Sequence, residues 1–167
     1  MNRFALFLLL SLAWAGCKHH PDDPATGPKI YFTGLTQVDE QGQALANPDP
    51  TDWRLDDVWT AQESALFASP ALPLCGTIPD STIVYAAPNP CKKVFILGLS
   101  KAPSGATWRF RIVDENFASL MTYDAVSGAN QVAINAASFP KDTLRVYYQL
   151  ETAGCVWRGH GDVLVEN

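Results

Sequence analysis

The amino-acid sequence predicts a mainly β fold, an antiparallel β-sandwich of about seven strands with one short helical segment. From Ser81 to the C-terminus, short segments alternate apolar and polar residues with a period of two and are separated by turn signals. This one-sided alternation argues against a parallel sheet that is covered on both faces. The sequence Thr-Ala-Gln-Glu at residues 60–63 has the pattern of a capping box and begins the helical segment.

Residues 1–16 are predicted to form a signal peptide. Arg3 supplies a short positive region, and the apolar run FALFLLLSLAW that follows is 11 residues long. A membrane-spanning helix needs about 20 apolar residues, so this run is too short to be one.

Cys17 follows the small residues Ala15 and Gly16, and this tripeptide resembles the lipobox of bacterial lipoproteins. The resemblance implies that Cys17 is acylated and becomes the first residue of the mature chain, with ordinary secretion as the alternative. Residues 17–28 would then be the lipidated cysteine and a flexible tether, because KHHPDDPATGP contains three prolines and no large apolar residue. The charged residues of the tether resemble surface-export signals of Bacteroidetes lipoproteins.

Residues 29–167 are expected to form a single globular domain, in which residues 29–80 supply a first strand and the helical segment. The stretch KIYFTGLTQVD alternates as a strand does, with Ile30 and Phe32 on one face. The helix that begins at the capping box would have about two turns. Because so short a helix is not stable alone, it must pack against the sheet. The residues available for this contact are Leu66, Phe67 and Trp59.

Residues 81–167 are expected to form the sandwich. Its seven strand segments are STIVYAA, KKVFILGLS, TWRFRIVDE, ASLMTYDA, NQVAINA, TLRVYYQLE and CVWRGHGDVLVE. In the third segment, the residues expected to face inward are Trp108, Phe110 and Ile112, and those expected to face outward are Arg109 and Arg111. In the sixth, the inward set is Leu144, Val146, Tyr148 and Leu150, and the opposite set is Arg145, Tyr147 and Gln149.

The cysteines favour one disulfide and one free thiol. If Cys17 carries lipid, three cysteines remain in the domain, and an exported chain permits disulfides. Cys75 follows SPALPL in a predicted loop and Cys155 follows TAG at a predicted turn, so they are the favoured pair, and Cys91 would be a small core residue. No CxxC pattern indicates zinc, and no metal site or cofactor is expected.

Residues 83–150 resemble the C-terminal sorting domain of type IX secretion cargo from Bacteroidetes. The resemblance rests on the PNP turn at residues 88–90, on Asp114 and on the strand around residues 144–148. It implies a small immunoglobulin-like β-sandwich and a bacterial lineage. It does not imply type IX export, because a lipid anchor would itself retain the protein. The layout as a whole resembles small Bacteroidetes lipoproteins without an assigned function.

Charge and composition exclude several classes of protein. The chain is 47% hydrophobic and 17% charged, which argues against disorder of the whole. Its formal net charge is −5, and the loss of Arg3 with the leader would make it −6. With no basic run, nucleic acid is not expected as a partner. The expected partners are the membrane, through the lipid anchor, and a carbohydrate or an envelope protein.

His160 and Asp162 are the strongest candidates for chemistry, since a histidine can act as a general base and an aspartate can orient it. On a strand, however, side chains two residues apart lie about 7 Å from one another, too far for a hydrogen bond unless the strand bends. Gly159 and Gly161 permit a bulge or close backbone packing, and the structural interpretation is favoured. No catalytic residue is therefore expected.

Three aspartates, Asp52, Asp56 and Asp57, could in principle bind calcium, but their spacing is not that of an EF-hand. Asp52 is expected to cap a turn before Trp53. Asp56 and Asp57 are expected to be solvated or to interact with the helix dipole.

The sequence therefore predicts a lipid-anchored, non-enzymatic binding or structural protein at the bacterial outer membrane, on the cell surface or the periplasmic face. One alternative is a small hydrolase-like enzyme using His160 and Asp162. The other is a carbohydrate-binding accessory protein, in which an exposed aromatic patch would contact the sugar. The candidate contact residues are Trp53, Trp59, Tyr147 and Trp157, and core packing is the competing interpretation for these aromatic residues.

Overall fold

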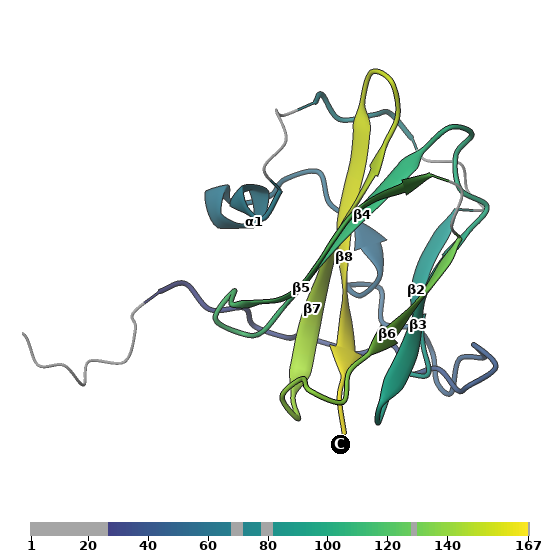
Figure 1. Ribbon diagram of the computed structural model, residues 1–167, viewed down its shortest axis with the longest axis vertical. Helices are drawn as coiled ribbons and strands as arrows, with labels where there is room; N and C mark the ends of the chain where they lie inside the picture. Colours follow the sequence, from purple (N-terminus) through teal and green to yellow (C-terminus); the bar gives the residue numbers. More distant parts are fainter. Residues whose placement is uncertain (1–26, 68–71, 78–81, 128–129, 167) are drawn as a thin grey trace, which may run out of the picture.

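The computed structural model describes residues 27–67, 72–77, 82–127 and 130–166, and it confirms a mainly β, antiparallel sandwich (Figure 1). The predicted signal peptide, Cys17 and most of the tether lie outside the described residues. The helix and strands are β1 (Arg54–Leu55), α1 (Ala61–Ala65), β2 (Ile83–Ala87), β3 (Val94–Ser100), β4 (Thr107–Val113), β5 (Ser119–Ser127), β6 (Gln131–Asn135), β7 (Thr143–Glu151) and β8 (Val156–Leu164). Strands β2 to β8 coincide with the seven segments expected from the alternation, and β1 is an additional short strand.

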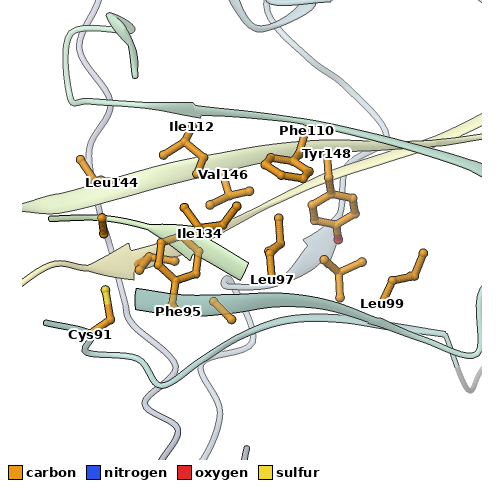
Figure 2. Close-up of a cluster of buried hydrophobic side chains, with 14 of the residues drawn as sticks. Cys91, Phe95, Leu97, Leu99, Phe110, Ile112, Ile134, Leu144, Val146 and Tyr148 are labelled. Carbon is orange, nitrogen blue, oxygen red and sulfur yellow. The ribbon is translucent and has the colours of Figure 1, made fainter. Parts of the chain in front are cut away.

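Two antiparallel sheets face one another. The larger has the strand order β1-β8-β7-β4-β5 and the smaller the order β2-β3-β6. Between them lies the main core, to which both sheets contribute the inward residues of their alternating strands (Figure 2). Its fully buried members include Phe95, Leu97, Phe110, Ile112, Ile134, Leu144, Val146 and Leu150.

The outer face of the larger sheet is also covered, and this corrects the expectation for Arg111 and Tyr147. Tyr147 is 0% exposed and Arg111 is 7% exposed, although both were expected on a solvated face. Ile30 and the segment that carries α1 lie against this face, with α1 on the side opposite the smaller sheet (Figure 1). A second core results, built from Ile30, Trp59, Phe67, Val113 and Tyr147.

The guanidinium of Arg111 remains hydrogen-bonded beneath the residues that cover the outer face of the larger sheet. Its Nε donates to the carbonyl oxygen of Leu66 (2.9 Å), and its Nη2 pairs with the carboxylate of Asp124. The guanidinium carbon also lies 4.7 Å from the centre of the Phe67 ring. These contacts allow a charged residue to be buried beneath the helical segment.

The expected first strand does not form a ladder. Ile30 donates its backbone N–H to the carbonyl of Glu115 (2.7 Å), and Val38 makes isolated bridges to Ala44 and Asn89. The alternation still shows in the burial, since Ile30 is buried and Tyr31 is exposed. The period of two in this segment therefore indicates which side chains face the sheet, although the segment has no continuous partner strand among the described residues.

Helix α1 begins at the predicted capping box. The Thr60 hydroxyl accepts a hydrogen bond from the Glu63 amide (3.2 Å), and the Glu63 carboxylate accepts one from the Thr60 amide (2.6 Å). The helix packs through residues that flank it, as expected. The rings of Trp59 and Phe67 stack with their centres 5.4 Å apart.

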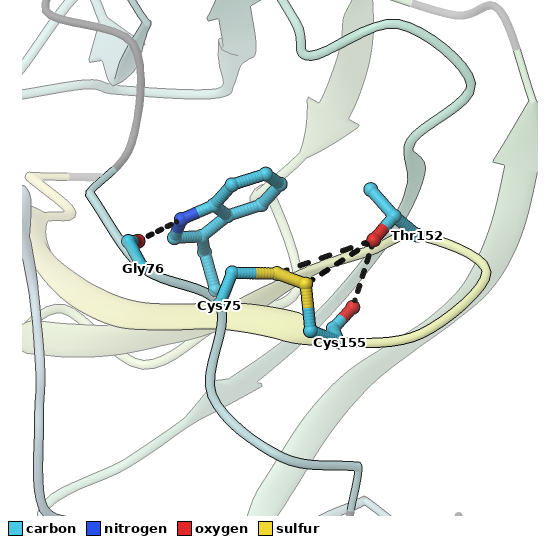
Figure 3. The surroundings of a disulfide bond; sticks show 5 residues. Cys75, Gly76, Thr152 and Cys155 are labelled. Atoms are coloured by element: carbon cyan, nitrogen blue, oxygen red, sulfur yellow. Dashed lines mark hydrogen bonds between the residues drawn. A yellow bond between two sulfur atoms is a disulfide. The ribbon is translucent and has the colours of Figure 1, made fainter.

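Cys75 and Cys155, the pair favoured by the sequence, form a disulfide that links residues 80 positions apart (Figure 3). Backbone hydrogen bonds accompany it, from the Cys75 amide to the Val156 carbonyl and from the Val156 amide to the Pro73 carbonyl. The disulfide thus attaches residues 72–77 to the start of β8. Cys91 is a buried free thiol, and burial raises its pKa.

Candidate functional site

A hollow of about 600 Å³, here called the groove, is bounded by the chain between residues 36 and 53 and by the smaller sheet. Its volume is within the range of about 300–1,000 Å³ that is usual for ligand pockets. The apolar part of the lining includes Val38, Ala44, Trp53, Ile83, Tyr85 and Ile96. The polar part includes Thr36, Glu40, Gln41, Ser100 and Gln131.

Trp53 lies in the wall of the groove in an unusual conformation. Its backbone φ is 50°, in the left-handed region that a bulky side chain rarely adopts. Its indole ring lies directly on Gly161, where an added Cβ would come 2.2 Å from the ring. The indole Nε1 is buried and has no hydrogen-bond partner among the described residues.

The buried carboxylate of Asp52 fixes the backbone around Trp53. Its Oδ1 accepts the amide hydrogens of Trp53 (3.0 Å) and Asp162 (2.7 Å), and its Oδ2 accepts that of Thr36 (2.7 Å). Burial raises the pKa of Asp52, although these amides favour its charged form. Asp52 therefore makes the predicted contact before Trp53 and also joins this turn to β8.

Tyr85 on β2 supplies a second aromatic ring to the groove. The ring crosses β3 above Gly98, where an added Cβ would lie 2.2 Å from Tyr85 Cζ. Gln131 on β6 donates from Nε2 to the Tyr85 hydroxyl (3.1 Å). Tyr85 and Gln131 were not among the predicted contacts. A tyrosine facing a glycine becomes a signal only once the register of β2 on β3 is known.

A second hollow of about 320 Å³, here called the polar pocket, lies beside β1 and β8. Its lining includes Tyr31, Thr33, Arg54, Glu63, Arg145 and His160. The pairing of Arg54 with His160 across β1 and β8 places Asp56 next to the imidazole. His160 Nδ1 and Asp56 Oδ2 are 2.7 Å apart.

Asp56 is buried, which corrects the expectation that it is solvated. Its Oδ2 also accepts a hydrogen bond from Trp59 Nε1 (3.0 Å), and Arg54 Nε lies 3.4 Å from its Oδ1. Burial opposes the ionisation of this carboxylate. The hydrogen bonds to His160 and Trp59, together with the charge of Arg54, outweigh burial and lower the pKa of Asp56.

Asp162 does not orient His160, so this part of the enzyme hypothesis is wrong. Both oxygens of Asp162 are bound by Arg145, from Nε and from Nη2, each at 2.8 Å. Arg145 lies directly opposite Asp162 on β7, and such cross-strand partners are closer than residues two apart along one strand. Gly159 and Gly161 serve close packing, since an added Cβ would meet the Arg54 carbonyl and the Trp53 ring respectively.

The four predicted aromatic contacts do not form one exposed patch. Trp59 and Tyr147 are 8% and 0% exposed and belong to the second core, so neither can contact a ligand directly. Trp157 lies near the disulfide, where its Nε1 donates to the carbonyl of Gly76 (2.7 Å). Of the four residues, Trp53 lines the groove.

No protein-family model, no curated protein and no solved structure matches this chain. Within the described ranges, no helix has the length and hydropathy needed to cross a membrane. In that same part of the chain, no group of three or more His, Cys, Asp or Glu side chains is placed to hold a metal ion. The chemistry of the groove and of the polar pocket is therefore the basis for a function.

Proposed function

We propose that this chain is a lipid-anchored, non-enzymatic binding protein of the bacterial cell envelope, located at the outer membrane, with the groove as its ligand site. The observation that supports the groove as the ligand site concerns the conformation and hydrogen bonding of Trp53. A backbone φ of 50° and an indole Nε1 without a partner both cost free energy, and both occur at one residue in the groove wall. Local costs of this kind are typical of functional sites.

The envelope location is supported by two independent features. The apolar leader ends in the lipobox-like tripeptide at Cys17, and the Cys75–Cys155 disulfide suits an oxidising compartment outside the cytoplasm. Two or three acyl chains on Cys17 would hold the domain stably at a membrane, whereas one chain holds only marginally. The resemblance of residues 83–150 to Bacteroidetes sorting domains supports the same lineage.

Mass spectrometry of the intact protein purified from envelopes tests the anchor. We expect a mature chain that begins at Cys17 and carries two or three acyl chains, and that fractionates with the outer membrane. A Cys17→Ser variant should lose both the mass of the acyl chains and the membrane fractionation. An unmodified N-terminus, or unchanged fractionation of the variant, would contradict the anchor.

A thermal-shift screen tests the groove as a ligand site. The full-length protein would be screened with neutral oligosaccharides, short peptides and fatty acids. At least one class should raise the melting temperature of the wild-type protein, because a ligand that binds only the folded state stabilises it. The same class should not raise that of Trp53→Ala. If no class shifts the wild-type protein, the groove is not the site.

A second candidate function, acid–base catalysis in the polar pocket, is favoured by the contact of 2.7 Å between Asp56 and His160. A carboxylate on Nδ1 orients an imidazole so that Nε2 is available as a base, and no described residue bonds to Nε2. Asp56 thus takes the role first considered for Asp162. The test is turnover of ester and glycoside substrates. Activity that is lost in His160→Ala would support an enzyme, and full activity in that variant would remove this candidate.

A further inference from the structure

We propose that the groove binds a neutral oligosaccharide, with the rings of Trp53 and Tyr85 as stacking surfaces. This inference rests on the proposed function, since it names the ligand class of the same groove. It is carried by the way in which the two rings are held, by the polar groups beside them and by the absence of positive charge in the groove lining.

The two rings share one arrangement. Trp53 lies flat on Gly161, and Tyr85 lies flat on Gly98, so in each case a glycine occupies one face of the ring. Both residues line the groove, and both are only partly buried. The face of an aromatic ring is negatively polarised and attracts the positively polarised C–H groups on the flat side of a sugar ring.

The rings are held in place before any ligand arrives. The carboxylate of Asp52 accepts a hydrogen bond from the backbone N–H of Trp53, and the side-chain amide of Gln131 donates one to the Tyr85 hydroxyl. Preorganised rings lose little conformational entropy on binding, which favours affinity for a flexible chain of sugars. The strained φ of Trp53 is explained in the same way, because it directs the indole onto Gly161 in the groove wall.

The polar residues of the lining suit hydroxyl groups. Gln41 and Gln131 offer amides, Glu40 offers a carboxylate, and Thr36 and Ser100 offer hydroxyls. Together they supply both donors and acceptors, and each sugar hydroxyl uses both. A hydrocarbon ligand would form no hydrogen bonds with these groups, so a sugar uses the lining more fully than a lipid tail does.

The charge of the groove lining further restricts the class of ligand. None of the described residues that line the groove is Lys, Arg or His, and the charged members of the lining are Glu40 and Asp52. The chain as a whole has a net charge of −5. Phosphate, sulfate and uronate groups would be repelled, so the oligosaccharide is a neutral one.

Calorimetric titration of the full-length protein with neutral oligosaccharides of glucose, mannose, xylose and N-acetylglucosamine tests the proposal. We expect at least one series to bind, and affinity to fall about tenfold or more in Trp53→Ala and in Tyr85→Ala. Trp157→Ala is the matched control, because Trp157 is also partly buried but lies outside the groove. Its affinity should stay within about twofold of the wild-type value.

Gly98→Ala tests the arrangement of the ring without removing it. The added methyl would meet the outer end of the Tyr85 side chain, which can rotate to another position. The fold should therefore be kept while the Tyr85 ring moves from its place over Gly98. Affinity for the oligosaccharide should fall as in Tyr85→Ala, with a nearly unchanged melting temperature. This variant and Tyr85→Ala keep the test decisive even if Trp53→Ala does not fold.

Three results would overturn the inference. The first is that no neutral oligosaccharide binds, and the second is that binding persists in both Tyr85→Ala and Gly98→Ala. The third is that a peptide or a fatty acid, and no sugar, binds in a manner sensitive to these substitutions. That last result would leave the groove as the ligand site and refute its assignment to a sugar.

Discussion

Asp52 joins three parts of the chain through one buried carboxylate, and its replacement tests how much that junction contributes. In Asp52→Asn, the amide group replaces an oxygen that accepts a backbone N–H, from Thr36 or from Trp53 and Asp162. A donor would then face a donor in a buried site. We expect the free energy of unfolding at pH 7 to fall by about 1–3 kcal/mol, as measured by urea denaturation.

Asp57→Asn provides the control for this experiment. Asp57 is exposed, and its described hydrogen bond is accepted by its backbone carbonyl from Arg158, not by its carboxylate. The substitution should change stability by no more than about 0.5 kcal/mol. Equal stability of Asp52→Asn and Asp57→Asn would show that the buried carboxylate has no structural role.

Asp56 gives the fold a defined dependence on pH. Its pKa in the folded protein is lower than its ordinary value of 3.8, so the folded state binds its proton more weakly than the unfolded chain does. The resulting stabilisation is complete above the ordinary pKa and is lost as the pH falls through the lowered one. The stability difference between the wild-type protein and Asp56→Asn should therefore shrink between about pH 5 and pH 2.

Denaturation of both proteins across that range measures the effect. The raised pKa of Asp52 acts in the opposite direction, but it is common to both proteins and cancels in the difference. A difference that does not vary with pH would mean that the pKa of Asp56 is the same in the folded and unfolded states.

At this scale the sequence could predict a contact only where both partners had a recognisable local signal. The cysteines of the disulfide and the capping box were found for that reason. The partner of His160 was not, because Asp56 lies 104 residues away and reaches it through the pairing of a two-residue strand. Alternation along β8 tells which face His160 occupies, and it carries no information about the neighbouring strand.

The short helix α1 depends on its cap and on its packing. In Thr60→Ala, the Glu63 amide loses the Thr60 hydroxyl as its acceptor. The hydrogen bonds that the Glu63 carboxylate accepts, from the Thr60 backbone N–H and from the buried Tyr147 hydroxyl (2.9 Å), remain. We expect a loss of about 1 kcal/mol in thermal or chemical unfolding. Ser64→Ala, an exposed substitution within the same helix, should be neutral or slightly stabilising. Similar losses in both variants would refute a specific role for the cap.

The disulfide attaches residues 72–77 to β8, and its removal tests that attachment. It closes a loop of about 80 residues, so the double variant Cys75→Ser/Cys155→Ser should lose about 2–5 kcal/mol of stability. Reductant should destabilise the wild-type protein by a similar amount and have no further effect on the double variant. A double variant as stable as the wild-type protein would show that the attachment is dispensable.

The strands of the sandwich could be predicted because their alternation is strict, and the first strand could not because alternation also arises in an extended segment that packs on a sheet. Ile30 and Phe32 face the sheet as a strand would, yet their backbone has no partner ladder. The same ambiguity explains why the prediction of a solvated face for Tyr147 and Arg111 was wrong. A tyrosine and an arginine on the outer face of a strand suit either water or a cover of aromatic residues.

At the scale of the whole molecule, residues 29–67 form a layer that covers the outer face of the larger sheet through Ile30, Trp59 and Phe67, extends the edge of that sheet with β1, and reaches the smaller sheet through residues 36–53. Figure 1 shows α1 and the smaller sheet on opposite sides of β4, β7 and β8. Because the layer lines both hollows, it contributes to the groove through Trp53 and to the polar pocket through Asp56. Composition and length predicted one domain, but this double role depends on tertiary contacts that no local pattern encodes.

The three-layer arrangement predicts that the sandwich strands cannot fold alone. A fragment of residues 72–167 keeps both cysteines of the disulfide but uncovers Val113 and Tyr147, each 0% exposed in the whole protein. It also loses the partners of the second core, Trp59 and Phe67. Burying a large apolar side chain contributes about 1.5–3 kcal/mol, so losing several approaches the whole stability of a small domain.

We therefore expect the fragment to aggregate or to bind the dye ANS without a cooperative thermal transition. A chain that begins at Gly27 keeps all of these contacts and should melt at the temperature of the full-length protein. If the fragment instead melts cooperatively, the layer of residues 29–67 is an addition to a sandwich that is complete without it. In that case the residues that this layer contributes to the groove could be exchanged without altering the fold beneath them.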